Sequence, residues 1–425
     1  MSRLLVLTVI LLAFGVGFFK ALGHHIATDF QAQQNAMTSS SDAHLQSRFA
    51  SSRQNTQTHA ASLVELKDGR IRAFWFSGSR EGAKDVEIHS AIFDPLHGQW
   101  GAERTVATRE GTQQSVLRYV SKLGNPVAGR AADGTLWLYY VTVSMGGWAG
   151  SSITAMTSLD EGETWSPPRR LVSSPFLNIS TLVKGAPFLY GDGTMGLPVY
   201  HEFISKFGEI LHLDKNGAVL DKQRLTSGRN GALQPVVLVK NSSEALALMR
   251  YSGTGTPHQV ISVSTSDSGQ HWTAPAKSSL LNPDAALSAV MMQGGRMLAV
   301  LNNQEQGRDT LSLMISADSG ISWKTIYQLE DQSATRSQQL DEAHYLKIAE
   351  ELVKDTVATG AGEYVESAKR QACAENNCRF EFSYPYLIQT RGGDFHLAYT
   401  WNRSFIKHVT FTQAWLDKQL GKTIP

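Results

Sequence analysis

An eight-residue frame that occurs three times constrains this chain more than any other feature of its sequence. It reads Ser-Leu-Asp-Glu-Gly-Glu-Thr-Trp at 158–165 and returns, with Asp, Gly and Trp at the same places, at 265–272 and 316–323. Asp and Ser side chains suit the amides of a tight turn, Gly suits its positive φ, and Trp can pack beneath the bend. The second interval is about half of the first, so this structural frame predicts propeller blades of roughly fifty residues.

A second repeat supports the same architecture. Apolar runs interrupted by a tight turn occur six times, at 63–75, 131–141, 189–200, 236–251, 291–303 and 387–401. Each run is typical of a β-hairpin. Six hairpins predict an all-β fold, a six-bladed β-propeller that forms one domain over about 56–417.

Residues 335–378 interrupt the hairpin pattern. Apolar residues there, among them Leu340 and Tyr345, recur at helical rather than alternating spacing. We therefore expect a helical insertion before the last blade. The only two cysteines, Cys373 and Cys378, lie close together in a polar stretch, which in an exported protein predicts a local structural disulfide rather than a metal site.

The amino terminus has a different character from the repeats. Residues 4–19 are apolar or small, a run shorter than the ~20 residues that cross a bilayer as a helix. With a weak small-x-small site at 21–23, the segment 1–23 is predicted to be a cleaved signal peptide or a short membrane anchor. Both readings place the domain outside the cytoplasm, periplasmic or secreted, and the polar segment 24–55 is expected to be a linker.

The balance of charged residues limits the kinds of partner that this chain is expected to bind. The chain carries 39 Lys and Arg residues against 38 Asp and Glu residues, for a formal net charge of +1, with no basic run. This balance argues against nucleic acid and against a polybasic membrane surface as partners. No ligand set for a metal or cofactor is apparent in the sequence, so we expect none, and we expect a monomer.

A polar loop after the first predicted hairpin carries the densest set of candidate residues. Arg80 and Asp85 follow a strongly apolar strand, and propellers place function where inner strands and their loops meet at one mouth of the channel. Repeated Asp boxes, an Arg five residues before an Asp, and Asn125-Pro126 before a hairpin together resemble the sialidase (neuraminidase) superfamily. Within it, the chain looks like the bacterial sialidase-like branch with BNR (Asp-box) repeats, over about 55–415.

The resemblance implies an exported exo-glycosidase that acts on an acidic sugar, sialic acid or a related one, of a glycan. Asp85 lies where sialidases keep the acid/base carboxylate, whose role requires a raised pKa. Tyr384 falls at the nucleophile position, where a neutral group avoids repulsion by the sugar's own carboxylate. Arg250 and Arg308 match two of the three carboxylate-binding arginines, and we expect Arg80 near them.

Two positions depart from the family pattern. His59 stands where the first carboxylate-binding arginine is expected, and Gln234 stands where a glutamate should activate the tyrosine. Gln cannot take a proton, so Glu202 is a candidate replacement base. His201 and His59 are candidate readers of a carboxylate or hydroxyl group.

Further contacts are expected at the rim. Asn125 and Trp148 are candidate substrate-binding residues, because an aromatic face packs well on a pyranose ring, and Lys122 is a plausible neighbour. Each candidate also has an ordinary structural interpretation. Asp85 could be a turn residue paired with Lys84 or Arg80, the arginines could form surface ion pairs, and Glu202 could belong to a solvated rim.

The sequence allows a second candidate nucleophile and two functions other than hydrolysis. Tyr386, one pleat away, is the alternative nucleophile, and Tyr384 would then be an ordinary strand aromatic. A polysaccharide lyase on the same propeller would use Arg or His to neutralise a uronate carboxylate and Tyr or His to abstract the C5 proton. The replacements at His59 and Gln234 favour this alternative, because β-elimination needs no activated nucleophile. A glycan-binding propeller without catalysis would keep the pocket, although it would have no need of Asp85 as a proton donor.

Overall fold

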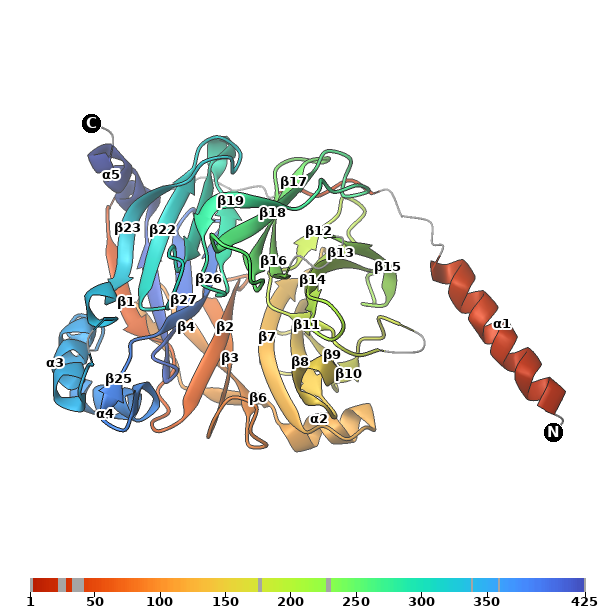
Figure 1. The fold of residues 1–425 in the computed structure, drawn as a ribbon, viewed down its shortest axis with the longest axis horizontal. Coiled ribbons are helices and arrows are strands. Elements are labelled where there is room, and N and C mark those ends of the chain that lie inside the picture. Colours follow the sequence, from red (N-terminus) through yellow and green to blue (C-terminus); the bar gives the residue numbers. More distant parts are fainter. Residues whose placement is uncertain are drawn as a thin grey trace.

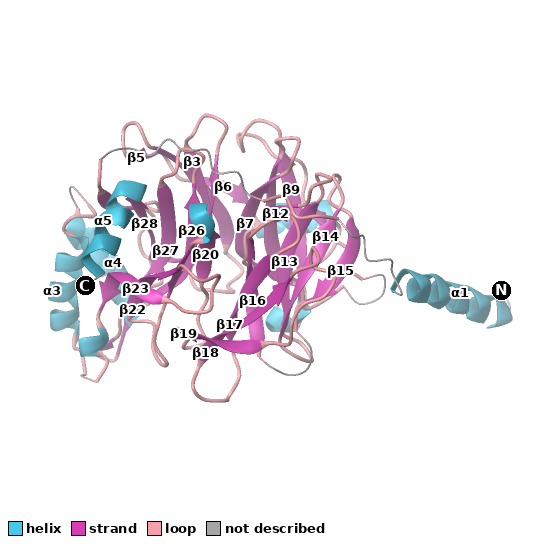
Figure 2. Cartoon of the chain, turned by 90° about the horizontal axis from the view of Figure 1, so that it is seen from above, coloured by secondary structure: helices cyan, strands magenta, loops and turns pink. Residues whose placement is uncertain are grey.

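The computed structural model describes residues 3–21, 28–32, 42–174, 178–226, 231–337, 339–357 and 360–423. Within these residues, six antiparallel sheets surround a central axis (Figures 1 and 2), so the predicted six-bladed β-propeller is confirmed. Apolar side chains fill the space between neighbouring blades. Phe74 and Phe76 of the first blade, for example, pack with Leu138 and Tyr140 of the second.

The first three blades follow the chain in order. Blade 1 contains β2 (Gln57–Glu65), β3 (Ile71–Gly78), β4 (Glu87–Asp94), β5 (Gln99–Trp100) and β6 (Arg104–Ala107). Blade 2 contains β7 (Lys122–Arg130), β8 (Leu136–Val143), β9 (Ser151–Ser158) and β10 (Arg169–Arg170), and helix α2 (Arg109–Val116) precedes it. Blade 3 contains β11 (Leu182–Val183), β12 (Phe188–Leu189), β13 (Met195–His201), β14 (Phe207–Leu213) and β15 (Val219–Arg224).

The other three blades complete the ring. Blade 4 contains β16 (Ala232–Val239), β17 (Ala245–Tyr251), β18 (Gln259–Thr265) and β19 (Ala276–Leu281). Blade 5 contains β20 (Ser288–Met291), β21 (Met297–Leu301), β22 (Thr310–Ser316) and β23 (Lys324–Asp331). Blade 6 contains β26 (Phe382–Gln389), β27 (Phe395–Trp401) and β28 (Phe405–Phe411), followed by helix α5 (Gln413–Thr423).

The three Asp boxes are turns between the third and fourth strands of blades 2, 4 and 5. In the first box, the Ser158 hydroxyl donates to Asp160 (2.7 Å) and accepts from the Gly162 amide (2.8 Å), while Asp160 also accepts from the Thr164 amide (2.9 Å). Gly162 has a φ of 88°, which glycine adopts without strain. The box is therefore a structural turn, as its residues predict.

The segment 24–55, expected to be a linker, contributes a strand. Within it, β1 (Leu45–Phe49) pairs with β28 in antiparallel register from Leu45↔Phe411 to Phe49↔Lys407. Blade 6 thus receives its outermost strand from the beginning of the chain, and the ring closes. The expectation of a linker fails here because the partner of β1 lies near the other end of the sequence, where no local pattern reveals it.

Residues 28–32 also dock on the propeller. Phe30 is 3% exposed and packs against Phe188 and Tyr190, with ring centroids 5.7 and 5.6 Å away. Its amide donates to the Ser242 carbonyl (2.7 Å), and the Gln31 amide donates to the Leu189 carbonyl (3.0 Å). This segment joins the turns of the inner hairpins of blades 3 and 4, and Gln31 and Ala32 line a pocket together with residues of the innermost strands.

Helix α1 (Arg3–Ala21) lies outside the propeller, on the side away from the helical insertion (Figure 2). Most of its apolar side chains are exposed. None of the helices in the described part of the chain combines the length and the apolar content that a membrane span requires. The candidate cleavage site at 21–23 falls largely outside the described residues.

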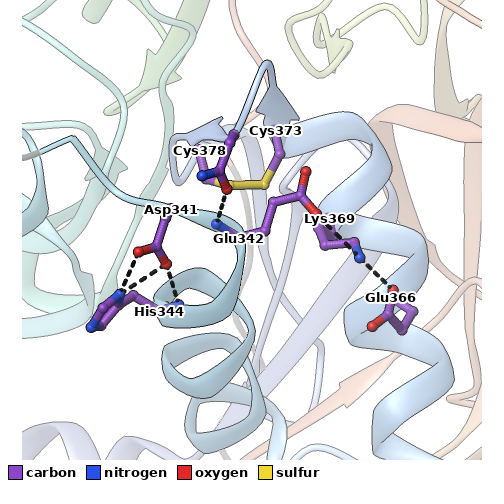
Figure 3. The surroundings of a disulfide bond; sticks show 8 residues. Asp341, Glu342, His344, Glu366, Lys369, Cys373 and Cys378 are labelled. Carbon is purple, nitrogen blue, oxygen red and sulfur yellow. Dashed lines mark hydrogen bonds and ion pairs between the residues drawn. A yellow bond between two sulfur atoms is a disulfide. The ribbon is translucent and has the colours of Figure 1, made fainter.

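The predicted helical insertion is present between β23 and β26. It consists of α3 (Glu342–Val353), α4 (Ala361–Ala372) and the short strands β24 (Cys373–Ala374) and β25 (Asn377–Cys378). Cys373 and Cys378 form the expected disulfide. Figure 3 shows the surrounding contacts: Asp341 caps α3 by accepting from the His344 amide (2.8 Å), and Lys369 pairs with Glu342 and Glu366.

Replacing Phe30 tests whether residues 28–32 stabilise the propeller. Phe30→Ala removes a buried aromatic ring, a change that typically lowers the free energy of unfolding by about 3–5 kcal/mol. We expect a lower Tm and faster proteolysis near residue 30. Leu96→Ala, at a side chain that is 92% exposed, is the matched control and should leave both unchanged; equal Tm values for the two variants would contradict the docking.

Candidate functional site

Each blade places one residue with a positive φ in or just before its innermost strand. These residues are Ala60, Asn125, Ser180, Gln234, Asp284 and Tyr384, with φ between 29° and 58°. In blades 1, 2, 4 and 6 the strand register shifts at this point. A bulge re-aims a side chain, and left-handed residues other than glycine concentrate at functional sites. This end of the channel is therefore the candidate site.

A chain of hydrogen bonds links four blades across this end. Gln234 Nε2 donates to the Tyr384 hydroxyl (3.4 Å) and to the Tyr200 hydroxyl (3.3 Å). Asn125 Nδ2 also donates to the Tyr200 hydroxyl (3.3 Å), and Arg250 donates to Gln234 Oε1 (3.3 Å). Burial raises the pKa of Tyr200 well above its ordinary value, so Tyr200 stays neutral. Tyr384 is thus held by an amide that can donate to its oxygen but cannot accept a proton.

Three arginines and two carboxylates form the charged part of the site. Arg250 Nε donates to Asp284 (2.6 Å), and Arg308 donates to the Asp284 carbonyl (2.8 Å). Arg308 also contacts Glu381 (3.4 Å), which accepts from Arg403 Nε (2.7 Å). Arg250 and Arg308, both predicted as substrate-binding residues, therefore lie in one group of charged residues beside Tyr384, which we call the Tyr384 cluster. Each of the two arginines already donates to a carboxylate or a carbonyl oxygen of the protein.

Glu381 is ionised in this cluster. Burial favours its neutral form, but the positive charges of Arg403 and Arg308 and the hydrogen bond from Arg403 lower its pKa to about 2. The Ser383 hydroxyl donates a further hydrogen bond (2.8 Å). Glu381 therefore acts as the shared counterion of two guanidinium groups.

His59 lies beside Tyr384, with ring centroids 4.4 Å apart. Burial lowers the pKa of His59 to about 4, although Glu81 and Glu381 oppose this effect, so the ring is neutral near pH 7. Its Nδ1 is buried without a hydrogen-bond partner in the described structure. The bulge residue of this strand is Ala60, one position further on. His59 consequently offers a neutral polar group, not the charge of an arginine.

Glu202 and His201 are adjacent in sequence but have different neighbours. The Glu202 amide donates to Ser180 Oγ (2.8 Å). Burial raises the pKa of Glu202, and the positive charges of Arg250 and Lys206 oppose this rise. The Glu202 carboxyl therefore lies close enough to Arg250 for the two charges to interact. His201 Nε2 instead lies 3.0 Å from Glu209 of β14, so it is held within blade 3.

The loop after β3 forms the rim. Asp85 is exposed and accepts from the Ser79 amide and hydroxyl (both 2.9 Å). It forms no ion pair with Lys84 or Arg80 in the described structure, so the pairing considered for it from sequence is not observed. Arg80 is exposed at the same rim, and no hydrogen bond within the described residues joins its side chain to the Tyr384 cluster.

Trp148 is partly covered by neighbours of blade 2. The Lys122 ammonium lies 4.3 Å from the centre of its ring. A Cβ atom at Gly124 would come within 2.8 Å of the indole, so Gly124 allows Trp148 to pack on the β7 backbone. These contacts leave the indole a smaller surface for a sugar than its sequence position suggests.

Sequence reasoning missed three residues of the cluster: Asp284, Glu381 and Arg403. A signal is present in three other blades, because Pro directly follows the bulge residue in Asn125-Pro126, Gln234-Pro235 and Tyr384-Pro385. Blade 5 departs from this order, because Pro283 precedes the bulge residue Asp284, so the dipeptide does not lead to Asp284. Nothing comparable marks Glu381 or Arg403. The described residues contain no group of three or more His, Cys, Asp or Glu side chains that could hold a metal ion.

The depressed pKa of Glu381 predicts a pH-dependent contribution to stability. The pKa of Glu381 is about 2 in the folded protein and near 4.3 in an unfolded chain. Its contribution to the free energy of unfolding is therefore fully present above the pKa of the unfolded chain and is lost as the pH falls towards the pKa of the folded protein. Glu381→Gln should therefore lower the free energy of unfolding at pH 7 by on the order of 2–3 kcal/mol, and the difference from wild type should shrink towards pH 3. Urea unfolding at both pH values measures this. Glu305→Gln, at an exposed site, is the control, and a difference independent of pH would contradict the assignment.

Comparisons with known proteins agree with the propeller fold. Residues 69–397 match the family described as the BNR repeat-like domain. No curated protein sequence matches the chain. Among solved structures, the Hadza microbial sialidase Hz136 superposes with a TM-score of 0.61 at 14% identity, covering 84% of this chain and 66% of that protein.

Two further structures extend the range of similar folds. The NanB sialidase of Streptococcus pneumoniae gives a TM-score of 0.58 at 10% identity, covering 85% of this chain and 69% of the other. The α-L-arabinanase of Penicillium chrysogenum gives 0.53 at 14% identity, covering 85% and 94%. At these identities the likeness shows the fold alone. Since the family match covers most of the chain and the fold agrees with it, the protein belongs to the BNR repeat-like family of sialidase-like propellers.

Proposed function

We propose that the protein is an exported exo-glycosidase that hydrolyses a terminal acidic sugar, sialic acid or a related one, from a glycan. The observation that carries the proposal is the position of Tyr384, whose hydroxyl accepts from Gln234 (3.4 Å) beside Arg250, Arg308 and Glu381. The similar folds named as sialidases and an arabinanase support a glycosidase. The disulfide Cys373–Cys378 supports export.

In the first step of the proposed reaction, the Tyr384 oxygen attacks the anomeric carbon while the glycosidic oxygen leaves with a proton from Asp85. The hydrogen bond from Gln234 Nε2 (3.4 Å) orients the Tyr384 oxygen, and Arg250 in turn donates to Gln234 Oε1 (3.3 Å). Glu202 takes the proton of Tyr384, since a carboxylate with a raised pKa is a stronger base.

In the second step, water attacks the glycosyl–tyrosine bond. Asp85 takes a proton from the water, and the Tyr384 oxygen leaves and recovers its proton from Glu202. Both groups return to their starting states, and the anomeric configuration is retained because two displacements occur at one carbon.

One observation favours a second candidate, a polysaccharide lyase. His59 is a neutral imidazole whose ring lies 4.4 Å from the Tyr384 ring, and β-elimination can use a neutral base beside a paired carboxylate. Hydrolysis releases a reducing sugar without ultraviolet absorbance, whereas elimination leaves an absorbing unsaturated uronate. Recording both signals on a panel of acidic glycans separates the two reactions.

Removing the Tyr384 hydroxyl tests the nucleophile. Tyr384→Phe should lower kcat on acidic glycans by at least about 10²-fold, because no oxygen remains to form the covalent intermediate. Tyr386→Phe is the matched control: Tyr386 is 3% exposed and lies in the regular ladder opposite Ala398, and its variant should keep kcat within a few-fold. If Tyr386→Phe lost activity and Tyr384→Phe kept it, the assignment would be reversed.

Asp85→Asn tests the acid. Loss of the proton donor should slow a natural glycoside by about 10²–10⁴-fold. An aryl glycoside of the same sugar, whose leaving group needs no proton, should lose far less in the first step. The values of kcat/KM on both substrates, which report the first step, measure this contrast, and an equal loss of kcat/KM on both would assign Asp85 a role in folding or binding instead.

A further inference from the structure

A cavity of about 830 Å³ lies between the candidate site and the helical insertion. Its walls carry four arginines and two carboxylates, namely Arg308, Arg336, Arg379, Arg403, Asp309 and Glu381. Arg308, Arg403 and Glu381 also belong to the Tyr384 cluster. The cavity therefore adjoins the candidate site and shares one wall with it.

The cavity has more positive than negative charge. Arg336 pairs with Asp309, to which its Nε donates at 2.8 Å. Arg308 and Arg403 share Glu381, at 3.4 and 2.7 Å. Arg379 is exposed, and its guanidinium forms no ion pair or hydrogen bond with the described residues. Arg403 also lies 3.9 Å from Glu81, so Arg379 is the arginine of this cavity that has no counterion among the described residues.

The backbone that carries Arg379 is fixed on both sides. Arg379 directly follows Cys378, which is bonded to Cys373 and whose amide donates to the Leu340 carbonyl (2.7 Å). The Arg379 amide donates to the Ala372 carbonyl (3.0 Å), and the next residue, Phe380, stacks on Tyr345 of α3. The disulfide drawn in Figure 3 therefore helps to hold the base of an otherwise unpartnered guanidinium at the cavity wall.

We propose that this cavity binds a negatively charged group on the saccharide unit next to the sugar held at Tyr384. The proposal rests on the proposed function and narrows its substrate class to oligosaccharides with acidic groups on successive units. Guanidinium groups match the planar oxygens of carboxylate and sulfate, and the volume lies in the range of saccharide-sized ligand sites. Arg379 is the arginine of this cavity that pairs with no carboxylate among the described residues.

Direct binding tests the cavity without relying on turnover. Full-length protein carrying Asp85→Asn keeps the probes intact, and calorimetry measures Kd for trigalacturonate, α2,8-linked trisialate and neutral maltotriose. We expect at least one acidic trisaccharide to bind, with an affinity that falls as salt rises, and Arg379→Gln to weaken it about tenfold. Arg370→Gln, an exposed change of the same charge on α4, should change Kd less than twofold.

Two results would overturn the inference: no acidic trisaccharide binds, or Arg379→Gln binds as tightly as its parent. Turnover by wild-type protein is measured separately on the same saccharides. Binding that depends on Arg379 without any turnover would support the cavity and contradict the hydrolase. Turnover with binding independent of Arg379 would support the hydrolase and contradict the cavity.

Discussion

The pairing of β1 with β28 is the interaction on which the rest of the structure depends. Five residues from the beginning of the chain complete the last sheet, and this pairing fixes blade 1 next to blade 6. Contacts across the same junction build the site: the Thr58 amide donates to the Arg403 carbonyl (2.9 Å), and His59 lies against Tyr384. Arg403 also lies 3.9 Å from Glu81. Without closure, the proposed nucleophile would lose its neighbours from blade 1.

The sequence predicts those features whose signals are local. Asp boxes and hairpins are each encoded within about fifteen residues, and the helical insertion has its own period, so the fold class could be predicted in full. The strand β1 could not be predicted, because Leu45–Phe49 is a short segment with only two apolar residues, and the strand with which it pairs lies far away in the sequence, at Phe405–Phe411. The same limit applies to Glu381 and Arg403. They matter only because folding places them beside Arg308, a residue of another blade.

The bulges explain why two tyrosines one pleat apart differ in their surroundings. Tyr384 has a φ of 53° and reaches Gln234 at the mouth. Tyr386 returns to the regular ladder opposite Ala398, inside the channel. There, Lys184 Nζ lies 5.3 Å from the centre of the Tyr386 ring and donates to the Pro385 carbonyl (2.6 Å). Burial lowers the pKa of Lys184 to about 7, and its hydrogen bond holds the backbone directly after Tyr384. One lysine from blade 3 thus supports the proposed nucleophile from below.

The two departures from the sialidase pattern are coupled through charge. A neutral His59 removes one positive charge from the expected set, and Gln234 removes one negative charge, so the net charge of these two positions is the same as that of the arginine and glutamate expected there. Arg250 shows how the remaining charges adjust: it keeps a hydrogen bond to the amide oxygen of Gln234 (3.3 Å) and takes Asp284 as its counterion (2.6 Å). A buried guanidinium that lost its carboxylate and gained no other would be strongly destabilising. Asp284 therefore supplies the carboxylate partner that Gln234 cannot offer to Arg250.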